Sequence, residues 1–463
     1  MMTETHQQLM KLPVNQVFFK YFVPATLGLI LMSANILIDG LFVGNGIGTA
    51  ALAGVNLSYP VISLIMAIAL WIGIGGATKY SISIGENRPK KASSIFSLAL
   101  FLALIISVLL GVFGILNIQT ISIWLGANSD TSSFVIEYLS VMFLFGWVIT
   151  LEQVLSIFVR NDGSPKLSMM ALATTSIVNI ILNFYTIMIL DMGVTGAAIS
   201  TVLGGFAGLL VLSLHFFNRQ AQLRRPAFQW SWKSLMHIFA IGFPSFLAEA
   251  GLLVFVTGYN LAMASLAGTE GVAAFSVINY LHGFMFLSFF GIEMALQPMI
   301  SYYHGAEETE QIKSSMKIGE KTAVILGILL LVIGWGAAPF LVGLFGIEST
   351  EIQQLAIDGI RLFFIGYTFL GYNFVYMSYF QSIGRAGSSV VIIILRSFVS
   401  LFILLWILPK FIGVTGVWLS LPLCCRPPLF HCKKTCDGKR KSRYREGMIL
   451  QPGDFPRLLS YRT

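Results

Sequence analysis

Two acidic residues are the strongest candidates for chemistry in this sequence, because each interrupts a long apolar stretch. Asp39 lies in ILIDGLFVG, and Glu249 lies in GFPSFLAEAGLLVFVTGYN. An ionisable side chain inside a membrane is unfavourable unless it faces a cavity or a partner, so each acid is a candidate functional group. A carboxylate in a low-dielectric cavity attracts a cation, and two cations do not share one negative charge cheaply. The pattern therefore indicates that two positive species exchange at an acidic site.

Neutral polar residues in other apolar stretches are candidate partners of Asp39. Asn179 and Asn183 are separated by about one helical turn, and Thr201 lies in the following stretch. We therefore assign Asp39, Asn179, Asn183 and Thr201 to a site that binds the coupling cation or proton. Two simpler roles stay open, namely an aspartate that sees water at the outer interface and amide hydrogen bonds between helices.

Glu249 lies about 12 residues into its apolar stretch, which places it near the middle of a membrane. We assign it to the cation-coupling or proton-coupling residues as a second acid, and an ion pair with a neighbouring helix is the alternative. We also expect a substrate cavity lined by Asp39, Glu249, Gln153 and Asn260.

Several classes of function are excluded by what the sequence lacks. The phosphate-binding pattern GxxxxGK[ST] and the nucleophile elbow do not occur, and the six histidines have no metal-ligand spacing. The sequence therefore predicts no ATP site, no bound metal, no organic cofactor and no enzymatic reaction. A gradient of H⁺ or Na⁺ remains as the energy source.

The composition indicates the environment of these residues. Hydrophobic residues make up 56% of the chain and charged residues 11%, with a mean hydropathy of +0.80, whereas soluble domains contain about 25% charged residues. Apolar stretches of about 20 residues predict an all-α polytopic membrane protein. The expected spans are 17–43, 50–78, 92–117, 134–158, 167–190, 195–217, 237–264, 271–300, 317–345, 352–381 and 388–409, with a twelfth beginning near 413.

A repeat at an offset of 220 residues relates the two halves of the chain. Pro24 corresponds to Pro244, and the tetrapeptide GVTG at 193–196 recurs unchanged at 413–416. Further pairs at the same offset are Gly48 and Gly268, Ala53 and Ala273, Ser81 and Ser301, Gly85 and Gly305, and Gly126 and Gly346. Such a series is difficult to obtain without duplication, and duplication in a very apolar chain is typical of transporters.

Basic residues indicate the orientation, because Lys-rich and Arg-rich loops stay in the cytoplasm. They gather near 11–20, 88–91, 160–166, 219–233, 313 and 385, whereas the opposite loops are acidic apart from Lys410. The N-terminus is therefore predicted to be cytoplasmic, and both halves to have the same orientation as parallel six-helix repeats. We divide the chain into an N-terminal lobe (1–217), a cytoplasmic linker (218–236), a C-terminal lobe (237–421) and an atypical tail (422–463).

The tail departs from the repeat. All four cysteines lie within it or at its start, and from Arg426 onward it contains ten Lys or Arg and three Asp or Glu. A zinc site from Cys424, Cys432, Cys436 and His431 is one interpretation, although paired CxxC units are missing. A basic segment lying on anionic lipid is the second. We prefer a third, in which the sequence leaves its ancestral reading frame near residue 422, so that the twelfth helix is lost or altered.

Several stretches of the chain resemble the multidrug and toxic compound extrusion (MATE) family. They are VPATLGLILMSANILIDGLFVG at 23–44, GTAALAGVNLSYP at 48–60, FVRNDGSPK at 158–166, NIILN at 179–183 and MGVTGAAIST at 192–201, and GFPSFLAE at 242–249 is similar to the MepA-like branch. The resemblance covers residues 15 to about 421. It implies two six-helix lobes around a central cavity that opens alternately to the two sides of the membrane.

The resemblance also assigns roles to single residues. Asp39 matches the family's first-helix aspartate, Asn179 and Thr201 match polar positions near it, and Glu249 matches the acid of the MepA-like branch. Asn183 departs from the family pattern, which usually has aspartate at this position. The cation site therefore has one negative charge fewer than the family pattern, and Na⁺ binding is less secure.

From these observations we expect a secondary multidrug antiporter that exports cationic amphipathic compounds in exchange for H⁺ or Na⁺. A flippase for a lipid-linked oligosaccharide is the alternative, although it requires a basic cavity, and the altered tail raises a further alternative of an inactive product. The expected location is the plasma or inner membrane. The expected partners are small cationic drugs and membrane lipids, without nucleic acid, and the expected state is a monomer.

Overall fold

Long apolar helices make up most of the structure, a computed structural model that describes residues 12–225, 227–347 and 349–425. Within these ranges, ten helices are long and apolar enough to cross a membrane. The prediction of an all-α polytopic membrane protein is therefore confirmed. The tail beyond Cys425, with Cys432, Cys436 and His431 of the zinc interpretation, lies outside the described residues.

From residue 12 onward, the first half of the chain contains seven α-helices, with a π-helix (η1) and a 3₁₀ helix (η2) continuing two of them. They are α2 (Val14–Gly46), α3 (Thr49–Gly85), α4 (Pro89–Leu116), α5 (Ile118–Trp124), α6 (Ser132–Asn161), α7 (Pro165–Asn183), η1 (Phe184–Ile189), α8 (Gly193–Ser213) and η2 (Leu214–Phe217). Pro89 and Pro165 begin α4 and α7, where the missing backbone N–H of proline leaves no hydrogen bond unmade.

The described part of the second half repeats the order of the spans, with a 3₁₀ turn inside its fourth span and a further α-helical segment after its π-helix. It consists of α9 (Trp232–Gly305), α10 (Thr309–Gly336), α11 (Ala338–Gly343), α12 (Thr350–Phe363), η3 (Phe364–Gly366), α13 (Tyr367–Ser382), α14 (Ala386–Ile393), η4 (Ile394–Ser400), α15 (Leu401–Ile412) and α16 (Val414–Cys425). The 74-residue α9 is two helices joined at a break, because Ala267 and Gly268 have non-helical backbone angles. This break separates the spans expected at 237–264 and 271–300.

The expected span at 317–345 is wrong at both ends. The transmembrane helix α10 runs from Thr309 to Gly336, and the short helix α11 follows it separately. The first half has the same arrangement, because α4 and α5 have the same bounds as α10 and α11 after a shift of 220 residues, to within one residue. Comparison of the two halves at this offset therefore predicts these helix ends better than apolar content alone.

Most left-handed backbone conformations occur in pairs that follow the repeat to within one residue, with Asp191 (φ 52°) as an exception. In the described residues, the glycines with positive φ are Gly48, Gly126, Gly163, Gly193, Gly268, Gly346, Gly384 and Gly413, which are four corresponding pairs. Asn87 and Glu307, which also correspond, have φ of 57° and 60°. Side chains other than glycine rarely adopt this conformation. The two halves therefore share turn geometry as well as helix order.

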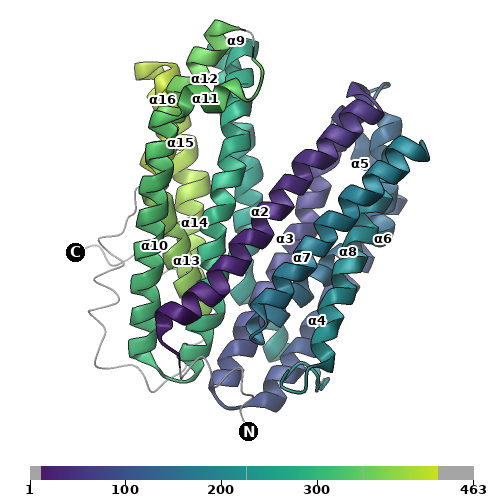
Figure 1. The fold of residues 1–463 in the computed structure, drawn as a ribbon, viewed down its shortest axis with the longest axis vertical. Helices are drawn as coiled ribbons and strands as arrows, with labels where there is room; N and C mark the ends of the chain where they lie inside the picture. Colours follow the sequence, from purple (N-terminus) through teal and green to yellow (C-terminus); the bar gives the residue numbers. More distant parts are fainter. Residues whose placement is uncertain (1–11, 226, 348, 426–463) are drawn as a thin grey trace. The chain divides into compact units, whose positions relative to one another are not determined.

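The two halves meet mainly along the second part of α3 and along α9, and Figure 1 shows the purple-to-blue helices gathered beside the green-to-yellow ones. The indole N–H of Trp71 donates to the carbonyl oxygen of Phe239 at 2.8 Å. Further along, Asn161 donates to Gln297 at 3.0 Å, and Gln297 donates to Thr78 at 3.0 Å. Helix α2 packs against both α7 and α9, so it contacts both halves.

Asp162, directly after the last residue of α6, binds the end of the first half and the start of the linker through hydrogen bonds. Its carboxylate accepts hydrogen bonds from the Tyr80 hydroxyl at 2.6 Å and from the backbone N–H of Leu223 at 3.2 Å. The imidazole of His215 lies 2.8 Å away, and both side chains are almost fully buried. Three segments are thus joined at one carboxylate, which holds the start of the linker against the helices.

Candidate functional site

Asp39 lies on α2 and is held by amide groups from α2 and α7. Asn183 donates from Nδ2 to Asp39 Oδ1 at 2.6 Å, and Asn35 donates from Nδ2 to Asp39 Oδ2 at 3.3 Å. Asn35 precedes Asp39 by one helical turn, so the two side chains share a face of α2. The aspartate is half-buried, whereas Asn183 is 1% exposed. This carboxylate is therefore held by neutral donors and not by an ion pair.

Asn179 of α7, like Asn183, places a terminal amide atom close to Asp39 Oδ1. One terminal atom of its amide lies 2.6 Å from Asp39 Oδ1. If that atom is nitrogen, it donates to Asp39, and the amide oxygen accepts from the Thr201 hydroxyl at 3.2 Å. If that atom is oxygen, two oxygens lie at a distance that requires a shared hydrogen between them. The amide orientation and the protonation of Asp39 are therefore linked.

Thr201 completes the group from α8. In the second amide orientation it accepts from Asn179 Nδ2 at 3.2 Å, and it donates to the carbonyl oxygen of Ala197 at 3.1 Å. Close packing of α7 and α8 makes this contact feasible, because a Cβ atom on Gly204 would lie 3.1 Å from Asn179 Cβ and 2.7 Å from the Thr175 carbonyl oxygen. The structure thus brings together Asp39, Asn179, Asn183 and Thr201; we call them, with Asn35, the Asp39 cluster.

A change of helix type occurs directly after this group. Helix α7 ends at Asn183 and continues as the π-helix η1 from Phe184. A π-helix inserts an extra residue into a helical turn and is found most often at functional sites. The second half has its counterpart, since α14 continues as the π-helix η4. The irregular turn therefore adjoins the polar residues of α7.

Glu249 lies apart from the Asp39 cluster and contacts the opposite half of the chain. Its Oε1 accepts a hydrogen bond from the Ser63 hydroxyl of α3 at 3.0 Å, and Ser63 is 4% exposed while Glu249 is half-buried. Across the ranges described, no hydrogen bond joins Glu249 to any member of the Asp39 cluster. The two acids are therefore separate sites in this conformation.

Gln153 and Asn260 are half-buried residues of α6 and α9, and the structure brings neither of them to an acid. In the described part of the chain, neither side chain forms a hydrogen bond with Asp39 or Glu249. Their expected place in a substrate cavity therefore stays a prediction. The neighbouring Glu152 is buried and accepts from the Thr175 hydroxyl at 2.8 Å, which gives it a structural role.

Three site residues were not anticipated from the sequence. Asn35 could have been found, because an amide one turn before an acid on the same helix is a recognisable pair. Tyr138 of α6 is 6% exposed and lies within electrostatic range of Asp39. Ser63 carries no sequence signal, since single serines are common in apolar helices.

The arrangement suits reversible binding of a small positive charge. Among residues 12–225, 227–347 and 349–425, ion pairs involve Glu86, Asp162 and Glu310, and none involves Asp39 or Glu249. A half-buried carboxylate without a protein cation attracts a proton or another cation strongly.

The chain matches a known family over most of its length. Residues 24–185 and 244–407 match the family model described as MatE. The multidrug export protein MepA of Staphylococcus saprophyticus is 26% identical over 409 residues, which cover 87% of this chain and 88% of that protein. A multidrug export protein MepA of Staphylococcus aureus is 25% identical over 423 residues, covering 89% of this chain and 91% of that protein.

Solved structures share the fold. A multidrug resistance MATE family transporter of the MOP superfamily, in an outward-facing conformation, has a TM-score of 0.85 at 24% identity and covers 90% of this chain and 94% of its own. A MOP superfamily transporter from Pyrococcus furiosus, described with a binding pocket of reverse polarity, has a TM-score of 0.86 at 22% identity, with 92% and 95% covered. These similarities support the helical architecture described above.

Proposed function

Because this chain belongs to the MatE family, we propose that it is a secondary antiporter that exports cationic amphipathic drugs in exchange for an inward-moving ion. The names of the MepA relatives support multidrug export. The observation that carries the proposal is the half-buried Asp39 carboxylate, which is held by amides and lacks a protein cation. The proposed location is the plasma membrane, with a cytoplasmic N-terminus and a monomeric transporter.

The geometry at Asp39 supports H⁺ as the coupling ion. Both carboxylate oxygens already accept amide N–H groups, from Asn183 and Asn35. A sodium ion needs several inward-facing oxygen atoms, and donors in these positions repel it. A proton on Asp39 needs one acceptor only: in the orientation that turns the Asn179 amide oxygen toward Asp39 Oδ1, that oxygen would accept it, whereas in the other orientation the amide nitrogen donates to the carboxylate at 2.6 Å. Rotation of this amide then accompanies protonation and deprotonation.

Exchange follows from competition for one charge. A cationic drug and a proton both neutralise the Asp39 carboxylate, and binding of either removes the attraction for the other. Protonation from the outside therefore releases the drug, and deprotonation toward the cytoplasm prepares the site for the next drug. The proton gradient drives the cycle without ATP.

Glu249 is a second acid, and its hydrogen bonding depends on how close the two halves are to each other. Its hydrogen bond from Ser63 joins α9 to α3, so movement of one half against the other breaks this bond. The exposed carboxylate then becomes available to a drug cation. We therefore propose that Glu249 contributes to drug recognition when the halves separate, beside the exchange of drug and proton at Asp39.

Transport by everted membrane vesicles tests this function. Vesicles that contain the protein should accumulate ethidium, a fluorescent lipophilic cation, when their interior is acid, and an ionophore that collapses the pH gradient should stop accumulation. The Asp39→Asn variant is the matched control for background uptake. Accumulation driven by a Na⁺ gradient and insensitive to the pH gradient would overturn proton coupling, and no accumulation under either gradient would overturn antiport.

A further inference from the structure

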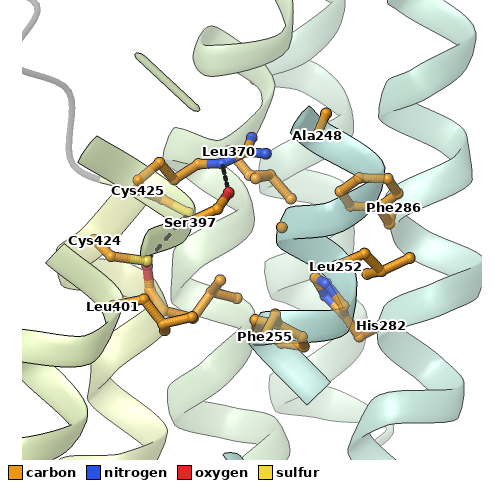
Figure 2. Close-up of a pocket in the computed structure, with 13 residues that line it drawn as sticks. Ala248, Leu252, Phe255, His282, Phe286, Leu370, Ser397, Leu401, Cys424 and Cys425 are labelled. Atoms are coloured by element: carbon orange, nitrogen blue, oxygen red, sulfur yellow. Dashed lines mark hydrogen bonds between the residues drawn. The ribbon is translucent and has the colours of Figure 1, made fainter. Parts of the chain in front are cut away.

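A pocket inside the second half is lined by a cationic side chain and has no role in the drug export proposed above. It lies between α9, α13, the π-helix η4 with α15, and the end of α16, and Figure 2 shows its lining side chains. Leu252, Phe255, Phe286 and Leu401 form apolar walls. The polar groups include Arg396, whose neighbour Ser397 also lines the pocket. A cationic drug is repelled by such a site.

Arg396 is a buried cation without a carboxylate at ion-pair distance among the described residues, and the buried Glu293 acts on it only from farther away. The side chain is 9% exposed, and its Nε–H donates to the Ser397 hydroxyl at 3.3 Å. Its guanidinium carbon lies 5.5 Å from the centre of the Phe374 ring. Over residues 12–225, 227–347 and 349–425, no carboxylate forms an ion pair with it. A buried, unpaired charge is unfavourable in a membrane, so an external anion would stabilise it.

The size and donors of the pocket restrict the class of anion. Its cavity volume is about 40 Å³, enough for about two or three waters and too small for a whole drug. With Nε directed to Ser397, the two terminal nitrogens of Arg396 remain for a ligand, and the Ser397 O–H is free to donate. Two parallel N–H donors match the two oxygens of a carboxylate.

We propose that this pocket binds the carboxylate head group of a long-chain fatty acid dissolved in the membrane. The carboxylate would pair with Arg396, and the first methylene groups would contact the apolar walls. The rest of the chain would leave the pocket on its open side, near outward-facing apolar residues such as Phe402 and Leu423, which are 52% and 41% exposed. Binding at this site is independent of the proposed drug exchange at Asp39.

Two cysteines provide a built-in reporter of occupancy. Cys424 and Cys425 line the same pocket as free thiols, with their sulfur atoms 3.9 Å apart. Figure 2 shows them on the side of Ser397. A bound carboxylate and its chain would hinder access of a reagent to both thiols. Cys432 and Cys436 are replaced by alanine in every protein tested, so that only the pocket thiols react.

The experiment measures alkylation of Cys424 and Cys425 by N-ethylmaleimide in purified protein reconstituted in phosphatidylcholine vesicles. Palmitate should slow the reaction, and Arg396→Gln should raise the palmitate concentration needed for half-protection by about tenfold or more, since a charge-assisted bond is lost. Arg385→Gln, which changes an exposed loop arginine, should leave protection unchanged. Equal protection of the Arg396→Gln protein would overturn the proposal.

Other probes test which chemical class of ligand binds, and they use protein in which Arg396 is unchanged. Misfolding of an Arg396 variant therefore cannot affect this part of the experiment. Hexadecanol, with the same chain and no charge, should not protect the thiols at palmitate concentrations that do. Acetate, with the charge and no chain, should protect only far above them. Protection by hexadecanol, by millimolar chloride, or by hexadecyl phosphate in preference to palmitate would each overturn a fatty-acid carboxylate as the ligand.

Discussion

Gly85 and Gly305 lie against each other's helices at the contact between the two halves, in a reciprocal arrangement. A Cβ atom on Gly85 would lie 2.2 Å from the carbonyl oxygen of Tyr302, and one on Gly305 would lie 2.1 Å from the carbonyl oxygen of Ile82. Tyr302 and Ile82 are themselves related by the repeat offset. The contact is therefore made twice by equivalent residues, and it requires that both positions lack a side chain.

The first prediction concerns this contact. Gly85→Ala should lower the free energy of unfolding by about 2 kcal/mol, because the added methyl group meets backbone that cannot rotate away. Thermal unfolding in detergent measures the effect. Gly283→Ala on α9 is the matched control, since its Cβ atom would meet nothing within 4 Å, and it should be neutral or stabilising. Equal stability of the Gly85 variant and the unsubstituted protein would contradict the close contact.

The second prediction concerns the charge at Asp39. Asp39→Asn should reduce export of ethidium to background while the amount of protein in the membrane stays unchanged, because the amide cannot exchange a proton for a drug. Asp130→Asn, in an exposed loop, should transport normally. Export by the Asp39 variant at the normal rate would show that this carboxylate is not the coupling group.

The third prediction uses the amide that replaces the usual acid. Asn183→Asp would place a second carboxylate at the position of an atom now 2.6 Å from Asp39. Two carboxylates this close do not both ionise without a cation between them. The variant should therefore gain stimulation of drug export by Na⁺, measured in vesicles at a fixed pH gradient. Asn117→Asp, at the end of α4, is the control, and an unchanged Na⁺ response in the Asn183 variant would contradict this view of the site.

The fourth prediction separates the two acids. Glu249→Gln should weaken export of cationic drugs more than export of neutral drugs, because only the former use its charge. Ser63→Ala keeps the charge and removes a bond worth about 1.5–3 kcal/mol, so it should change apparent drug affinity without abolishing export. Ser288→Ala, at an exposed position of α9, should have no effect. Equal losses for neutral and cationic drugs in the Glu249 variant would indicate a structural role.

The fifth prediction concerns the end of the C-terminal lobe. The described part of helix α16 has 12 residues, which span about 18 Å, less than a hydrocarbon core of about 30 Å. Replacement of the residues after Ser420 by an apolar span patterned on 201–217 should increase stable membrane expression, measured by fluorescence-detected size-exclusion chromatography. If the unsubstituted chain is expressed and transports as well as this chimera, and its tail is protected from external protease in intact cells, the proposed frame change is wrong.

The repeat made much of the architecture predictable. Paired glycines such as Gly48 and Gly268 can be recognised in sequence, because a left-handed turn accepts few other residues. Asp39 and its partners on α7 and α8 were also recognisable, since polar groups are rare in apolar spans. Apolar content alone misplaced α10, because the amphipathic start of this helix at Thr309 carries charged residues that a hydropathy criterion rejects.

Contacts between the halves could not be predicted in the same way. The bond from Ser63 to Glu249 joins residues 186 positions apart, and its formation depends on how α3 and α9 approach each other. Arg396 lies in an apolar stretch of the sequence, and the sequence alone does not show which groups surround it. Only the packing of α9, α13 and α16 around it shows that the charge lies beside a pocket without an acidic partner.

The neutral side chain of Asn183 also determines which part of the ion gradient can do work at the Asp39 cluster. Under the proposed mechanism, one carboxylate would exchange one proton for one monovalent drug cation, and the exchange would be electroneutral. The membrane voltage, worth about 2.3 kcal/mol per charge at 100 mV, then contributes nothing, and only the pH difference drives export. Each pH unit supplies about 1.4 kcal/mol, which limits drug accumulation to about tenfold per unit, so cells at neutral external pH would depend on slow drug entry for protection.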